Sequence, residues 1–173
     1  MKRLIFLAVF IIAFCAFAQV DLKPVDDKDA VTFVIKNFGI NTPGSFTGLK
    51  GSIKWNAENP SNSSFNVSVD ANTINTSIDA RDNDLRKEKY FDVAKYPTIN
   101  FVSANISAAS VTGNLTIKGI TKSVTFPFTV TKQGNGYLFE GSFTINRRDF
   151  DVGGSSMVLA DNVTVKLKVQ ANP

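Results

Sequence analysis

Hydrophobic and polar residues alternate along most of the chain, in runs short enough to be β-strands. The clearest run, residues 124–130, has an apolar residue at every even position. The same period of two marks the runs 65–69, 111–117, 137–145 and 163–169. This alternation predicts strands with one buried face and one wetted face, as in antiparallel sheets.

Three further segments, residues 31–36, 44–55 and 98–103, also have the pattern of strands. In the second of them Phe46 and Ile53 fall on opposite parities. We therefore predict a β-bulge near Gly48, which would return both side chains to one face.

Short polar turns separate these runs. Gly-containing segments at residues 118–121 and 133–136 predict hairpins, and residues 59–63 break the chain between two more strands. No repeat, linker or low-complexity tract interrupts residues 19–173. We expect one all-β domain of about eight antiparallel strands, arranged as a closed barrel or a sandwich.

Residues 1–18 differ from the rest and predict a secretory signal peptide. Two basic residues precede an eleven-residue apolar run, and Ala16-Phe17-Ala18 supplies the small residues that signal peptidase requires. The apolar run is too short to span a membrane. We expect cleavage after Ala18 and a periplasmic or secreted protein without a transmembrane segment. A retained N-terminal anchor is the alternative.

Composition narrows the possible chemistry. The chain has no histidine, and Cys15, its one cysteine, lies within the predicted signal. Histidine-based catalysis, histidine-rich zinc sites and thiol chemistry are therefore excluded from the mature protein. Without the signal, 17 basic residues face 15 acidic ones, a net charge of +2 that predicts no nucleic-acid binding. We identify no catalytic residue, metal site or cofactor.

One segment, residues 80–101, breaks the alternating pattern. Nine charged residues fall within its first sixteen positions, and Tyr96-Pro97 then stops any helix. Acidic residues at the start and basic residues at the end suit a helix dipole, while Ile78 and Leu85 form an apolar stripe. We predict one short helix, at about residues 79–89, packed beside the sheet.

Phenylalanine is concentrated on the predicted inward faces. Eight such residues either fill a packed core or line a barrel wide enough for one apolar ligand, since eight-stranded barrels occur in both forms. Alternation alone leaves both possibilities open.

The charged segment and the stretches around it resemble the YceI-like family. "ARDNDLRKEKYFDVAKYPTINF" is similar to the family's helix signature and the Phe-Phe and Tyr-Pro motifs that follow it. "GSFTGLKGSIKWNAENPSNSSFNVSVDANTINT", "VTGNLTIKGITKSVTFPFTV" and "TINRRDFDVG" agree in the same order, so that the resemblance covers nearly the whole mature chain.

The resemblance implies a lipocalin-like β-barrel that is not an enzyme and encloses a polyisoprenoid or similar lipid. A quinone or a prenyl phosphate would fit this class of ligand. The implied pocket lining consists of inward-facing positions, namely Phe33, Phe46, Ile53, Phe65, Val67, Phe91, Phe101, Leu115, Phe126, Phe128, Phe139, Phe143, Val165 and Leu167.

The polar mouth of the implied pocket departs from the family pattern. Relatives often carry histidines where this chain has Asn37, Asp84 and Lys118. These three residues either bind a polar head group, with Lys118 able to meet a phosphate, or are ordinary surface residues. Arg147 is a further polar candidate, with a structural role in closing a turn as its alternative.

Two functions from different classes remain. The first is an exported carrier that holds an apolar chain inside its barrel. The second is an exported module with a packed interior that binds another protein through an exposed patch, for example around Phe38 or Val102. The sequence leaves the ligand's identity and the oligomeric state open.

Overall fold

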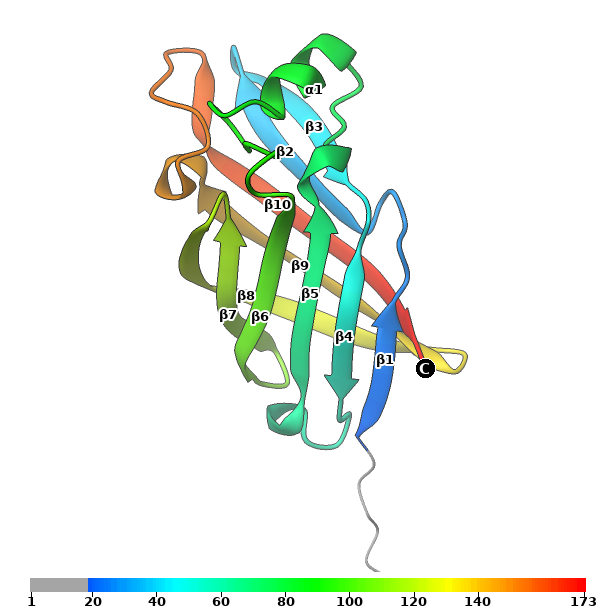
Figure 1. The fold of residues 1–173 in the computed structure, drawn as a ribbon. Coiled ribbons are helices and arrows are strands. Elements are labelled where there is room, and N and C mark those ends of the chain that lie inside the picture. Colours follow the sequence, from blue (N-terminus) through cyan, green and yellow to red (C-terminus); the bar gives the residue numbers. More distant parts are fainter. Residues whose placement is uncertain (1–18) are drawn as a thin grey trace, which may run out of the picture.

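Residues 19–173, which the computed structural model describes, are mainly β-structure with one α-helix (Figure 1). The helical segments are α1 (Asp79–Leu85) and the short 3-10 turns η1 (Pro60–Asn62), η2 (Ala71–Thr73) and η3 (Arg147–Phe150). The strands are β1 (Val20–Pro24), β2 (Val31–Asn37), β3 (Ile40–Phe46), β4 (Lys50–Trp55), β5 (Ser64–Asp70), β6 (Thr98–Ile106), β7 (Ser110–Ile117), β8 (Ile120–Gln133), β9 (Gly136–Asn146) and β10 (Leu159–Asn172). The signal-peptide prediction falls on residues 1–18, outside this range.

Eight of the strands form a closed antiparallel barrel. Their order is β1-β4-β5-β6-β7-β8-β9-β10, and β1 pairs with the end of β10 to close the ring. The prediction of an eight-stranded antiparallel barrel is confirmed, and the sandwich alternative is wrong. The two-residue hairpins at 118–119 and 134–135 are also present, between β7 and β8 and between β8 and β9.

The hairpin β2–β3 widens one end of this barrel. β10 pairs with β1 only at residues 171–172, whereas its N-terminal half pairs with β2. The free side of β3 makes one isolated bridge, from Ser45 to Asn75, which joins the hairpin to the segment after β5. The wall thus contains additional strands at the end opposite to β1, and Figure 1 shows the hairpin there beside α1. Because barrel diameter grows with strand number, this end is the wider one.

The prediction of one bulged strand over residues 44–55 is wrong. The chain leaves β3 at Phe46 and starts β4 at Lys50, and the two strands have different neighbours. Gly48 has a positive φ of 72°, and the Asp26 carboxylate accepts hydrogen bonds from the backbone N–H groups of residues 48 and 49 at 3.0 Å. This anchored turn redirects the chain, which a bulge would not do.

The helix is shorter than predicted. α1 ends at Leu85 instead of continuing to residue 89. The chain then folds back, since the N–H of Phe91 bonds the carbonyl of Leu85 at 3.0 Å and the N–H of Val93 bonds the carbonyl of Arg86 at 3.1 Å. These turn bonds replace the helical ladder that the charge pattern suggested.

An aromatic cluster fills the narrow end of the barrel. Trp55 packs edge to face against Phe128 and Phe139, with ring centroids 6.1 and 5.5 Å apart, and Phe65 packs against the same two rings. The buried indole N–H of Trp55 has no hydrogen-bond acceptor among the described residues. We call these four residues the aromatic plug.

Candidate functional site

A cavity of about 820 Å³ occupies the wide half of the barrel, above the aromatic plug. Its walls are inward-facing apolar side chains of β2, β5, β6, β7, β9 and β10. Phe126 and Phe143 stack with ring centroids 4.5 Å apart and belong to the lining next to the plug. The barrel is therefore solid at one end and hollow at the other.

Glycines in the wall leave room for phenylalanine rings to lie against the sheet. Gly44 is the cross-strand partner of Phe33, and a Cβ on Gly44 would meet the tip of that ring at 2.2 Å. The ring of Phe101 covers Gly113 in the same way, at 2.4 Å. A ring that rests on a glycine projects less far into the lumen, which helps to keep the cavity open.

The helix and the loop after it form one side of the cavity's mouth. Ile78, Leu85 and Phe91 contribute apolar surface to the lining. Asp82 is buried and accepts hydrogen bonds from the backbone N–H of Thr76 at 2.9 Å and from its hydroxyl, which fixes the start of the helix.

Arg86 fixes the other end of this segment. Its guanidinium donates to the backbone carbonyls of Asn72 at 2.7 Å and Ile74 at 3.0 Å. Two of the charged residues that made this segment conspicuous in the sequence, Asp82 and Arg86, therefore help to hold its apolar face over the cavity.

Arg147 holds the opposite side of the mouth, the loop between η3 and β10. Its side chain is only 4% exposed and pairs with Asp161 at 2.9 Å. It also donates to the backbone carbonyls of residues 152, 153, 154, 159 and 160. These hydrogen bonds support the structural role, closing a turn, that was the alternative for Arg147. Its acidic partner is Asp161, and the side chain also borders the cavity.

The structure divides the fourteen predicted lining residues into two groups. The group that lines the cavity consists of Phe33, Phe46, Val67, Phe91, Phe101, Leu115, Phe126, Phe143, Val165 and Leu167. The remaining four, Ile53, Phe65, Phe128 and Phe139, do not line it and belong to the packed core around the aromatic plug. They face inward as predicted, but at the level where the barrel is narrow and its interior is filled.

The predicted polar mouth is only partly assembled. Asn37, Asp84 and Arg147 border the cavity. Lys118 does not: its ammonium group bonds the backbone carbonyl and the carboxylate of Asp151, at 2.8 and 3.0 Å. The prediction that Lys118 belongs to the mouth is therefore wrong, because this ion pair draws the side chain to a neighbouring loop.

Asp84 is already paired with a cation. Lys87 lies 2.6 Å from its carboxylate, and this hydrogen bond, together with the charges of Lys87 and Lys89, lowers the pKa of the exposed Asp84. The carboxylate stays ionised at neutral pH, and the positive charge of Lys87 offsets its negative charge at the mouth.

Two cations at the mouth, Arg81 and Lys89, were not singled out in the sequence. Both line the cavity, from α1 and from the loop after it. Arg81 donates to the hydroxyl and the carbonyl of Thr76, at 2.7 and 2.6 Å. Helical spacing could have identified Arg81, because residues 78, 81 and 85 lie on one face of a helix. Ile78 and Leu85 had already been predicted to form the apolar stripe on that face.

The site suits binding of an apolar group better than acid–base or metal chemistry. Its walls are mainly apolar, and its charged groups Arg81, Asp84 and Lys89 lie on the helix and the loop at the mouth. Within residues 19–173 no three acidic side chains gather where they could hold a metal ion. No helix in that range is long and apolar enough to cross a membrane.

Comparisons with known proteins agree with this architecture. A UPF0312 protein of Yersinia enterocolitica is 33% identical over 166 residues, 87% of this chain and 86% of the relative. The crystal structure of BcnA from Burkholderia cenocepacia superimposes with a TM-score of 0.79 at 29% identity, covering 84% of this chain and all of BcnA.

A more distant neighbour has the same fold. It is a polyisoprenoid-binding domain from Saccharophagus degradans implicated in plant cell wall breakdown, with a TM-score of 0.69 at 16% identity over 90% of this chain and 99% of the neighbour. The family model of the YceI-like domain matches residues 23–171, which run from within β1 to the penultimate residue of β10. Barrel, hairpin, helix and cavity all lie within that match, and the chain belongs to the YceI-like family.

Proposed function

We propose that this protein is an exported, non-enzymatic lipid carrier that holds one polyisoprenoid or similar apolar chain inside its barrel. The observation that carries this proposal is the apolar cavity of about 820 Å³, which is blocked by the aromatic plug at one end and opens at the other. A volume of this size lies within the range of small-molecule binding sites.

The distribution of polar groups indicates how such a ligand would lie. Hydrocarbon walls favour the chain, because each buried CH₂ group contributes about 0.8 kcal/mol. Asn37, Arg81 and Lys89 border the cavity and offer hydrogen-bond donors to an oxygen-rich head group. The chain therefore enters first, and the head group of a quinone or a prenyl phosphate stays at the mouth.

The relatives support a binding function without defining the ligand. The Saccharophagus domain binds polyisoprenoids, but at 16% identity it shares only the fold with this chain. The absence of histidine from the sequence favours binding over turnover. Export is part of the proposal because residues 1–18 have the pattern of a secretory signal.

The alternative, an interaction module with a solid interior, requires a filled barrel. The cavity counts against that alternative, although the aromatic plug shows that half of the barrel does fit it.

Native mass spectrometry, followed by solvent extraction of protein purified from its own host, tests the carrier proposal. We expect a bound lipid with a long apolar chain, which geranylgeraniol displaces with one-to-one stoichiometry. The variant Val165→Trp, which fills the cavity wall, should lose this ligand. Val102→Trp, on an exposed position of β6, should keep it. Equal retention by both variants, or protein without any lipid that fails to bind geranylgeraniol, would overturn the proposal.

A further inference from the structure

Exposed hydrophobic residues gather around the mouth of the cavity. Among residues 19–173 seven large hydrophobic side chains are exposed, and two of these, Val25 and Val102, lie elsewhere. The other five are Phe38, Ile40, Ile78, Met157 and Val158, which we call the apolar rim. Phe38, Ile78 and Val158 also line the cavity, so the rim is continuous with its opening.

Phe38 occupies a position that folding alone would not assign to phenylalanine. Phe38 and Gly39 form the two-residue turn between β2 and β3, with φ values of 51° and 75°. Such turns favour Asn-Gly, and a bulky residue with positive φ is an outlier. With 73% of its surface exposed, Phe38 gains little burial in return. Strain of this kind, with no compensation from packing, points to a function.

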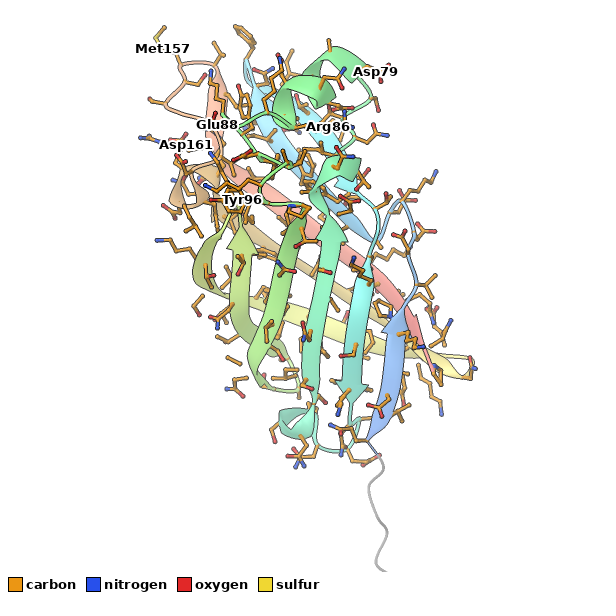
Figure 2. The ribbon with its side chains drawn as sticks, viewed as in Figure 1. Asp79, Arg86, Glu88, Tyr96, Met157 and Asp161 are labelled. Carbon is orange, nitrogen blue, oxygen red and sulfur yellow. The ribbon has the colours of Figure 1, made fainter. Side chains whose placement is uncertain are left out.

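Four of the five rim residues belong to the tip of the hairpin β2–β3 and to the loop before β10, and these two segments are joined by a hydrogen bond. The backbone N–H of Phe38 bonds the carbonyl of Val158 at 2.8 Å, which ties the hairpin tip to the loop before β10. Within that loop the Ser156 hydroxyl accepts hydrogen bonds from the N–H groups of residues 158 and 159. Met157 is fully exposed between them, and Figure 2 shows it at the tip of this loop, at the same end of the molecule as Asp79 of α1.

The charges around the rim are sparse on the side of the hairpin and balanced on the side of the helix. Segments 36–42 and 153–158 carry a single charge, that of the exposed Lys36. On the helix side of the mouth, the cations Arg81 and Lys89 border the cavity, while Asp84 is paired with Lys87. Lys89 forms no ion pair within the described part of the chain. Residues 78–89 on that side contain four acidic and four basic residues, with Asp79 and Glu88 exposed, so the side has no net charge. A largely uncharged apolar rim around an apolar cavity matches an interface with the hydrocarbon of a lipid layer.

We propose that the apolar rim docks on the surface of a lipid bilayer. The bound chain then passes between membrane and cavity without crossing water. This inference rests on the proposed carrier function, since it concerns how the ligand reaches that same cavity. A bilayer fits better than a protein partner, because the most exposed side chains stand at separate loop tips and the cavity opens between them.

Vesicle flotation with phosphatidylcholine–phosphatidylglycerol liposomes tests the docking surface. Phe38→Asn creates Asn-Gly, the favoured sequence for this turn, so its thermal stability should equal or exceed that of the parent chain. This variant, and separately Ile40→Thr/Met157→Ser at two exposed rim positions outside the cavity lining, should each reduce binding to vesicles at least about tenfold, since tenfold corresponds to about 1.4 kcal/mol. Val102→Thr, which removes an exposed apolar residue far from the mouth, is the matched control and should bind like the parent.

Geranylgeraniol binding in solution, measured on the same proteins, separates the two proposals. Retained geranylgeraniol binding in Ile40→Thr/Met157→Ser, together with lost flotation, supports docking, because neither position lines the cavity. A parent protein that binds geranylgeraniol but does not float with vesicles overturns docking alone. A parent protein that self-associates through the rim, seen as dimers that Phe38→Asn dissolves, also overturns it in favour of a second copy as the occupant.

Discussion

The two ends of the barrel share most of their strands and both carry inward-facing phenylalanines, yet one end is solid and the other hollow. On β9, Phe139 belongs to the aromatic plug, while Phe143, four residues further on, lines the cavity. The difference comes from the surroundings, since the hairpin β2–β3 widens only one end. Identical side chains therefore fill the core at one level of the barrel and line the cavity at the next.

Truncation of one phenylalanine at each end should give the largest contrast. Phe139→Ala removes a buried ring from the plug and should lower the free energy of unfolding by about 3–5 kcal/mol. Phe33→Ala, in the cavity wall, should cost less stability but weaken geranylgeraniol binding, because its ring already faces open space. Urea unfolding and ligand titration measure the two effects, and equal stability losses would contradict the division into two ends.

Removal of the buried cation at the mouth should be the next largest effect. Arg147→Met leaves five loop carbonyls without their donor and Asp161 with Arg148 alone, and should cost about 3 kcal/mol. Arg148→Met is the control, since Arg148 is half exposed and reaches Asp161 at 3.3 Å, and should cost less than about 1 kcal/mol. Chemical denaturation distinguishes the two variants, and similar losses would show that the loop does not depend on Arg147.

A methyl group added at Gly44, behind the ring of Phe33, should reduce the volume of the cavity. In Gly44→Ala the new Cβ displaces the ring of Phe33 towards the lumen, at a stability cost of about 1 kcal/mol. Affinity for geranylgeraniol should fall about tenfold, or about 1.4 kcal/mol. The double variant Phe33→Ala/Gly44→Ala, in which no ring is left to displace, should bind no more weakly than Phe33→Ala alone. A further loss in the double variant would show that Gly44 acts by another route.

The smallest expected effect concerns the exposed pair at the mouth. Since Lys87 lowers the pKa of Asp84, the pair stabilises the folded chain above the unfolded pKa of 3.8, and this contribution is lost as the pH falls through the lowered folded value. Asp84→Asn should therefore melt at a slightly lower temperature than the parent at pH 7. The two melting temperatures should converge at a pH below the lowered pKa of Asp84. Thermal scans at both pH values check this. A difference that persists in acid would mean that Asp84 acts through something other than its charge.

Alternation and turn chemistry were sufficient to predict about eight antiparallel strands and the inward position of the phenylalanines, whereas the barrel was chosen over the sandwich only by the family resemblance. They were not sufficient to separate Phe139 from Phe143, because the local pattern is the same and the width of the barrel depends on strands far away in sequence. Lys118 was misplaced for a similar reason: its partner, Asp151, is 33 residues away. The helix end was missed because the competing bonds of residues 91 and 93 form only in the folded loop.

The glycines that support Phe33 and Phe101 suggest how ligand range can change within this architecture. Neither Gly44 nor Gly113 belongs to the cavity lining, so a mutation there alters the usable length of the barrel while every lining residue stays the same. Two relatives with identical pocket residues would then accept chains of different size. The range of ligands that such proteins accept should be inferred from the small residues behind the cavity wall as well as from the residues that line the cavity.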